Sequence, residues 1–259
     1  MHRLFNRLRR LNLAKIHARL VPGWRHLHLS RIRRCLCCER VSLVEVRDPR
    51  GERQRCLLCG ANLRYEMLAV AVRRLGDLHS KTVLELDYRS PLQGLLSQAG
   101  IHHRSYFDPA DKPGQMREDG ARCEDITALT FPDAAIDLLV SSEVLEHVPD
   151  FDAAAREITR VLKPGGLHLF TVPTAETHDT VQRAKLEGGQ VVHLMTPEYH
   201  GDSTTGGGIL AFWSFGLDLA GRMDRYGLKT SVLLEKRNDQ GELLRIVWGS
   251  IKPSDPRRP

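Results

Sequence analysis

Residues 125–173 constrain the fold more than any other part of the chain. The stretch reads DITALTFPDAAIDLLVSSEVLEHVPDFDAAAREITRVLKPGGLHLFTVP. It predicts a short acidic turn, followed by a buried strand over residues 136–140 and a loop that ends in Glu146 and His147. A helix is expected over residues 152–162. A Lys-Pro-Gly-Gly turn then leads into a second buried strand over residues 167–172. Two apolar strands joined by an amphipathic helix form one step of an open parallel sheet. An α/β protein is therefore expected.

Other segments extend this sheet in both directions. Residues 81–86 (KTVLEL) predict its first strand, and a second strand is expected to end at the apolar pair before Asp108. Residues 230–235 and 243–251 are β-rich and joined by a polar turn, which predicts a C-terminal hairpin that adds one antiparallel strand. Residues 174–208 are polar and predict an extended loop region.

Charge and cysteine spacing suggest four parts: a basic amphipathic segment over residues 1–34, a zinc ribbon over 35–62, a main domain over 63–252 and a disordered tail over 253–259. Residues 1–34 contain ten Lys or Arg and no acid, whereas the remainder holds 28 basic and 32 acidic residues. The basic character therefore belongs to the N-terminal segment.

The N-terminal segment has leucines at roughly helical spacing, with arginines between them. Such a helix can lie on an anionic membrane surface, contact nucleic-acid phosphates, or pack on its own protein or a partner subunit. The sequence does not decide between these three interpretations.

Four cysteines have the spacing of a zinc ribbon. Two C-x2-C pairs are separated by seventeen residues, and each pair can direct two thiolates at one point. Scattered thiols or two disulfides are the alternatives, but disulfides are disfavoured in a chain without an export signal. We therefore predict a closed, structural Zn²⁺ site, with Cys37 as a spare thiol that could compete as a ligand; the predicted ligands are Cys35, Cys38, Cys56 and Cys59.

The strand, helix and turn order of residues 125–173 resembles the second half of class I S-adenosylmethionine (SAM)-dependent methyltransferases. A ribbon followed by an apolar-faced helix resembles a bacterial subgroup of these enzymes, often linked to surface-glycan synthesis. The resemblance covers essentially the whole chain. It implies a Rossmann-like, seven-stranded, mostly parallel sheet with an N-terminal zinc ribbon, and SAM as the cofactor.

The resemblance also implies which residues contact the cofactor. Asp108 matches the ribose-binding acid, Asp125 and Ile126 match the adenine site, and Glu85 would orient the first loop or meet the SAM amino group. The full set of predicted cofactor contacts is Glu85, Asp87, Asp108, Asp125, Ile126 and Ser141. The family's glycine-rich loop is missing, since Asp87, Arg89 and Pro91 stand at its glycine positions. Each isolated acid could instead cap a turn.

Histidines in the second half of the chain are the candidates for catalysis. Methyl transfer is an in-line displacement, in which the enzyme positions the acceptor and removes its proton where needed. His200 has a suitable pKa for a base, and Glu198 or Asp202 could orient it. His147 is a further candidate, as is His193. A loop of turn-capping side chains, or a metal site formed by His193, His200 and Asp202, are the alternatives.

The sequence as a whole predicts a SAM-dependent methyltransferase (EC 2.1.1.-) acting on a small polar acceptor, namely a sugar or a glycan-related metabolite. One alternative is an RNA methyltransferase that uses the ribbon and the basic arm. Another is a non-catalytic scaffold whose glycine-poor loop no longer holds SAM. We expect a cytoplasmic protein, with peripheral contact at the inner membrane surface through residues 1–34 as an option; the oligomeric state is not predicted.

Overall fold

The computed structural model describes residues 27–46, 54–201 and 208–254. The chain divides into two compact units, one formed by residues 1–74 and 89–95 and the other by residues 75–88 and 96–259. Residues 1–26 of the predicted basic amphipathic segment and residues 255–259 of the predicted tail lie outside the described residues, whereas residues 27–34 of that segment form strand β1.

The first unit contains a small antiparallel sheet and a helix. Strands β1 (Leu27–Arg34), β2 (Val41–Val46) and β3 (Gln54–Cys56) pair in that order and are followed by α3 (Leu63–Arg74). The buried carboxylate of Glu66 on α3 accepts the Leu36 N–H at 2.6 Å and pairs with Arg33 at 2.7 Å. These contacts attach the helix to the strands. The short helix α4 (Gln93–Leu96) crosses the boundary between the two units.

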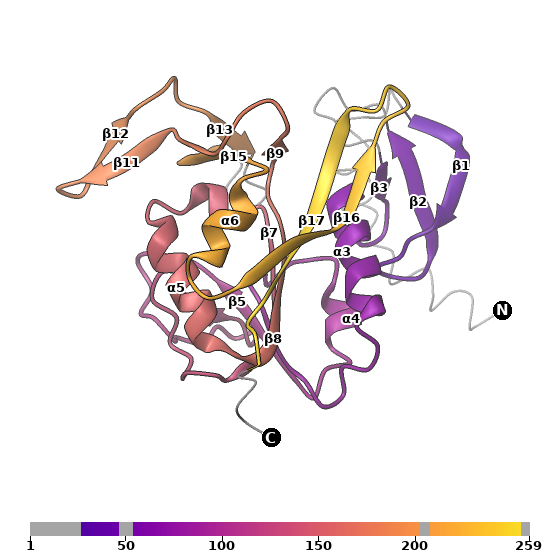
Figure 1. Cartoon of the computed structure of the whole chain (residues 1–259). Helices are drawn as coiled ribbons and strands as arrows, with labels where there is room; N and C mark the ends of the chain where they lie inside the picture. Colours follow the sequence, from indigo (N-terminus) through magenta and orange to yellow (C-terminus); the bar gives the residue numbers. More distant parts are fainter. Residues whose placement is uncertain (1–26, 47–53, 202–207, 255–259) are drawn as a thin grey trace. The chain divides into compact units, whose positions relative to one another are not determined.

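The second unit is built on a seven-stranded sheet (Figure 1). Only β17 runs antiparallel to the other strands, which confirms the predicted mostly parallel sheet and its C-terminal hairpin. The strand order is β16-β17-β8-β7-β4-β5-β6. The strands are β4 (Thr82–Glu85), β5 (Ile101–Tyr106), β6 (Arg122–Cys123), β7 (Ile136–Ser142), β8 (Leu162–Thr171), β16 (Lys229–Arg237) and β17 (Leu243–Ile251).

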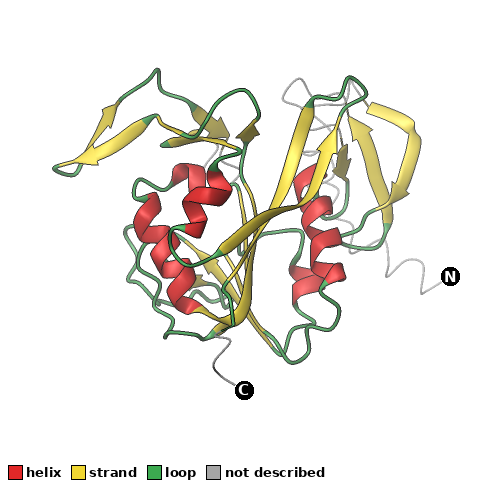
Figure 2. Ribbon diagram, in the orientation of Figure 1, coloured by secondary structure: helices red, strands yellow, loops and turns green. Residues whose placement is uncertain are grey.

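Helices α5 (Phe151–Val161) and α6 (Leu219–Asp224) cover one face of this sheet, as Figure 2 shows in red. Asp150 begins α5 as its N-cap and accepts the Ala153 N–H at 2.8 Å. The apolar side of α5 packs into a core with the central strands, in which Leu139, Ile158 and Phe170 are fully buried. Burial on both faces explains why these strands read as continuous apolar runs.

The described residues between 174 and 216 form seven short strands, several of them paired, most clearly as the hairpin of β11 with β12 (Figure 1). The prediction of a polar loop over residues 174–208 is therefore wrong in part. Backbone hydrogen bonds, rather than an alternating apolar pattern, define these mostly exposed strands. They are β9 (Thr174–Ala175), β10 (Val181–Gln182), β11 (Ala184–Glu187), β12 (Gln190–His193), β13 (Tyr199–Gly201), β14 (Gly208–Leu210) and β15 (Trp213–Gly216).

Within the part of the chain that the structure describes, no helix combines the length and apolar character needed to cross a membrane.

Candidate functional site

The strand order reverses at β4, which places a topological switch point between β4 and β7. From β4 the chain adds β5 and β6 on one side and then returns to place β7 on the other. In open α/β sheets, ligands bind at the carboxyl ends of the strands next to such a point. Acidic side chains lie at or directly after the carboxyl ends of all four strands here. They are Glu85 in β4, Asp108 after β5, Asp125 after β6, and Glu143 and Glu146 after β7.

Glu85 is buried at the end of β4. Its Oε2 lies 3.0 Å from His102 Nε2, and its backbone oxygen accepts the Ser105 hydroxyl at 3.1 Å. Asp87, two residues beyond the strand, is half-buried. The Glu85 carboxylate is therefore held by a partner on the neighbouring strand β5.

Asp108 and Asp125 occupy equivalent positions, each two residues beyond a strand. Oδ1 of Asp108 accepts the Ala110 N–H at 3.0 Å, and Oδ1 of Asp125 accepts the Thr127 N–H at 2.8 Å. Both side chains thus support their own turns through one oxygen. Asp108 is exposed and Asp125 is half-buried, so each carboxylate has solvent access for a ligand.

Ile126 and Ser141 are both buried. Ile126 packs in the core beside the central strands. Ser141 lies within β7 rather than in the loop expected after residue 140, and its hydroxyl hydrogen-bonds His168 Nε2 at 2.9 Å. Strand β7 extends through Ser142 because the hydroxyls of its last two residues find partners on β8, His168 and Thr171.

The structure brings His147 and His200 together, although 52 residues separate them in the chain. Their ring centroids are 5.0 Å apart, and both rings approach Glu146. His147 Nε2 and His200 Nδ1 each lie 3.8 Å from Glu146 Oε1. Glu146 and His147 belong to the 3-10 helix η2 (Leu145–His147), and His200 belongs to β13. We call this group of three residues the Glu-His-His cluster.

Residues 210–213 fix the position of η2. The Phe212 N–H donates to the Glu146 carbonyl at 2.7 Å, and His147 Nδ1 donates to the Leu210 carbonyl at 2.9 Å. Trp213 Nε1 donates to the Val148 carbonyl at 2.9 Å. Three hydrogen bonds from one short segment therefore hold both η2 residues of the cluster in place.

Burial and mutual charge shift the pKa values of the cluster. Burial raises the pKa of Glu146 to about 7, whereas the neighbouring carboxylates of Glu146 and Glu198 raise the pKa of His200 to about 9. Burial lowers the pKa of His147. His147 is therefore neutral at pH 7, and the pair formed by buried Glu146 and half-buried His200 shares its protons.

Sequence reasoning identified the two histidines of the cluster but missed Glu146 as a site residue. The available signal was the E-x-x-E-H run of residues 143–147, placed directly after a buried strand. His193, the weaker histidine candidate, is exposed on β12 and lies outside the cluster. Asp202 lies outside the described residues.

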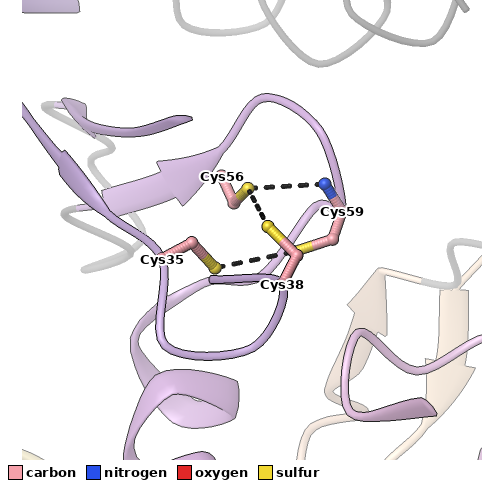
Figure 3. Close-up of side chains that lie close together, drawn as sticks. All are labelled: Cys35, Cys38, Cys56 and Cys59. Carbon is pink, nitrogen blue, oxygen red and sulfur yellow. Dashed lines mark hydrogen bonds between the residues drawn. The ribbon is translucent and has the colours of Figure 1, made fainter. Parts of the chain in front are cut away.

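The four predicted cysteine ligands converge in the first unit (Figure 3). Cys35 Sγ lies 3.6 Å from Cys59 Sγ, and Cys38 Sγ lies 3.7 Å from Cys56 Sγ. These separations exceed the ~2.05 Å length of a disulfide bond. They match the spacing of about 3.8 Å between thiolates bound ~2.3 Å from one tetrahedral zinc ion.

The two cysteine pairs also share one backbone conformation. The N–H of Glu39 donates to the Cys35 carbonyl at 2.8 Å, and the N–H of Gly60 donates to the Cys56 carbonyl at 2.9 Å. Both donors have a positive φ, 58° at Glu39 and 83° at Gly60. Cys37 lies outside the group of four, and its thiol donates to the Tyr65 carbonyl. The described residues thus form two matched knuckles around four thiols.

Comparison with known proteins relates the second unit to methyltransferases. Residues 108–170 match the family described as "Methyltransferase domain". A 2-methyl-6-phytyl-1,4-hydroquinone methyltransferase of Synechocystis sp. is 33% identical over 89 residues, which are 34% of this chain and 26% of that protein. A probable S-adenosylmethionine-dependent methyltransferase of Mycolicibacterium smegmatis is 38% identical over 121 residues, which are 46% of this chain and 37% of that protein. The chain therefore spans well under half the length of these curated relatives.

Among solved structures, an S-adenosylmethionine-dependent methyltransferase from Mesorhizobium loti is similar, with a TM-score of 0.44 and 12% identity; the match covers 71% of this chain and 96% of that one. The second unit's own strand order, with its single antiparallel strand, agrees with the family match. The chain has the class I methyltransferase fold, and its residues 108–170 match the methyltransferase domain family.

Proposed function

We propose that this protein is a SAM-dependent methyltransferase that acts on a small polar acceptor. One observation carries the proposal: acids follow the carboxyl ends of four successive sheet strands, on both sides of the switch point, in a sheet with the class I methyltransferase order. The methyltransferase family match over residues 108–170 covers four of these five acids, all except Glu85.

SAM would supply a methyl group on a sulfonium sulfur, and residues along this edge would hold it. Asp108, which keeps solvent access beyond β5, would accept the two ribose hydroxyls. Asp125 would accept the adenine amine beside Ile126, and Glu85 with Asp87 would support the first loop. Ser141, which is buried in β7, is the remaining member of the set of cofactor contacts that the resemblance implies. These assignments keep the roles that the family resemblance implies.

We place the acceptor at the Glu-His-His cluster, which follows β7 at the same edge. Since the displacement is in line, the chain's main tasks are to orient the acceptor and to receive its proton. The neutral ring of His147 and the proton-sharing pair of Glu146 with His200 offer groups for that transfer. The resemblance to ribbon-bearing methyltransferases supports a sugar or a glycan-related metabolite as the acceptor.

Calorimetric titration of the zinc-replete protein with SAM and with S-adenosylhomocysteine tests the cofactor assignment. We expect micromolar binding. Asp108→Ala should weaken it about tenfold or more, because two hydrogen bonds worth ~1 kcal/mol each are lost. Asp239→Ala, in the turn between β16 and β17, is the matched control and should bind like the wild type. No binding to the folded wild-type protein would instead favour the non-catalytic scaffold.

The acceptor class is tested by measuring S-adenosylhomocysteine release with nucleotide sugars, short glycans and RNA. Turnover with sugars or glycans would support the proposal. Turnover with RNA alone, lost at high salt, would replace it with the RNA methyltransferase alternative.

We further propose that the four cysteines of the first unit hold a structural Zn²⁺. Their spacing and paired knuckles fit a closed tetrahedral site, which leaves no position for a substrate. Elemental analysis should find one zinc in this site. Cys56→Ser should lose it, while Cys37→Ser should retain it, because Cys37 lies outside the group of four. A fully folded wild-type chain without metal would refute the proposal.

A further inference from the structure

Glu146 is a buried carboxylate without a hydrogen-bond partner. Its side chain is 1% exposed, and neither Oε1 nor Oε2 forms a hydrogen bond with any residue that the structure describes. Buried carboxylates are normally paired or bound to metal ions, because an isolated buried charge costs several kcal/mol. The nearest cationic candidates are two histidine nitrogens at 3.8 Å, beyond hydrogen-bonding distance. His200 therefore lies within ion-pair range of Glu146, but no described residue donates a hydrogen bond to either carboxylate oxygen.

Hydrogen bonds outside the cluster set which nitrogen of each histidine faces Glu146. His147 donates from Nδ1 to the Leu210 carbonyl at 2.9 Å, and His200 donates from Nε2 to Glu198 Oε1 at 3.0 Å. In the neutral rings, His147 Nε2 and His200 Nδ1 then carry the lone pairs. Metal-binding histidines typically donate their other N–H to a carbonyl or carboxylate in this way.

The ligand atoms are spaced to surround one ion. Glu146 Oε1 lies 3.8 Å from each histidine nitrogen, and the three residues' ligand atoms all lie within 4.8 Å of one another. Two ligands bound ~2.1 Å from a tetrahedral ion are about 3.4 Å apart, so a contraction of a few tenths of an ångström would complete the coordination. Two imidazoles with one carboxylate favour Zn²⁺, Mn²⁺, Fe²⁺ or Co²⁺ over Ca²⁺.

A second carboxylate adds negative charge beside the cluster. Glu143 adopts a left-handed backbone conformation with φ 56°, which is strained for a residue with a side chain, and its buried Oε1 has no hydrogen-bond partner among the residues that the structure describes. Its Oε2 lies 3.9 Å from Arg245 Nη1, a cation on β17 that offsets part of this charge. Two incompletely satisfied carboxylates near one point favour a bound cation.

We propose that Glu146, His147 and His200 bind one divalent transition-metal ion. This site is separate from the four cysteines, and with three protein ligands it leaves coordination positions open to a small molecule. Metal binding does not depend on the proposed methyltransferase function. It would change that function in one respect: ligated histidines no longer serve as bases, so their role becomes that of holding the ion where the acceptor binds.

The test uses Co²⁺, titrated into the full-length protein that carries one molar equivalent of Zn²⁺ for its four-cysteine site, and followed by calorimetry and by visible d–d absorption. We expect one Co²⁺ per chain, bound through nitrogen and oxygen. Glu146→Gln and His200→Ala should each weaken binding at least tenfold, whereas His193→Ala, which removes an exposed histidine on β12, should not change it. Absence of Co²⁺ binding to the wild type, or equal loss in His193→Ala, would overturn the proposal.

A second measurement does not need the variants to fold. Pulsed electron paramagnetic resonance of Mn²⁺ bound to the wild-type protein should show coupling to imidazole nitrogen, and bound Mn²⁺ without such coupling would contradict the site. SAM is titrated into the same preparation. SAM binding without metal binding would refute the metal site alone, and metal binding without SAM binding would refute the proposed function alone.

Discussion

Acidification between pH 7 and pH 5 should destabilise the second unit through His168. This histidine lies on β8, is fully buried, and hydrogen-bonds Ser141 through Nε2 while its Nδ1 has no partner among the described residues. Burial lowers its pKa to about 3. The unfolded chain binds a proton below pH ~6.5 and the folded chain does not, so stability falls as the pH falls between these two values.

The expected loss follows from the size of this shift. Each pH unit below ~6.5 costs about 1.4 kcal/mol, which gives about 2 kcal/mol between pH 7 and pH 5. His168→Gln keeps a polar group near Ser141 but cannot titrate. Urea unfolding at both pH values, followed by circular dichroism, should show a loss of stability in the wild type that exceeds the loss in the variant by about 2 kcal/mol.

Other histidines do not obscure this comparison. Burial also lowers the pKa of His103 and of His147, so acid destabilises the fold through them with the same sign. Both are present in the wild type and in His168→Gln, and their contributions cancel in the difference. His178→Gln, which changes an exposed histidine, should retain the wild-type pH dependence. An equal loss of stability in His168→Gln and the wild type would refute the reasoning.

Three further substitutions probe the same unit. Gly216→Ala should destabilise the fold by ~1–3 kcal/mol, because the added Cβ would collide with a neighbouring backbone carbonyl. Gly221→Ala in α6 should stabilise the fold by up to ~1 kcal/mol, because its added Cβ meets no atom within 4 Å. Thermal unfolding of both variants checks these two expectations. Burial opposes ionisation of Asp137, but Lys163 and the Thr82 N–H outweigh it and lower its pKa. Asp137→Asn should therefore be less stable than the wild type at pH 7, and urea unfolding should show this difference shrinking below pH ~4 as the wild-type carboxylate is protonated.

The central sheet could be predicted because its strands are buried on both faces. Residues 136–140 and 167–172 are nearly continuous apolar runs, and Asp150 marks the start of the helix between them. The Lys-Pro-Gly-Gly run ends the helix as predicted, but it lies within β8 at an irregularity in the pairing with β7 and does not form a separate turn before the strand. Residues 174–216 carried no such signal. Their strands span two to four residues and are mostly exposed, so the pairing depends on backbone hydrogen bonds that side-chain patterns do not encode.

The sequence predicted the acids on the β5 and β6 side of the switch point better than it predicted the Glu-His-His cluster on the β7 side. The acids after β5 and β6 stand at fixed distances from strand ends, and their positions follow directly from the sequence. The contact of His200 with His147 requires β13 to fold back over 52 residues, which spacing alone cannot show. Glu146 was missed because its importance comes from burial without a partner, a property of the assembled structure.

The Glu-His-His cluster depends on a segment that contributes none of its three residues. Residues 210–213 hold η2 through the carbonyls of Glu146 and Val148 and through the His147 ring, while the Ala211 N–H donates to the Glu198 carbonyl at 2.8 Å. Because Glu198 in turn accepts from His200, the same segment fixes both histidines. Their lone pairs can face Glu146 only when residues 208–216 are folded against η2. Anything that bound or displaced this segment would therefore change the geometry of the whole cluster at once.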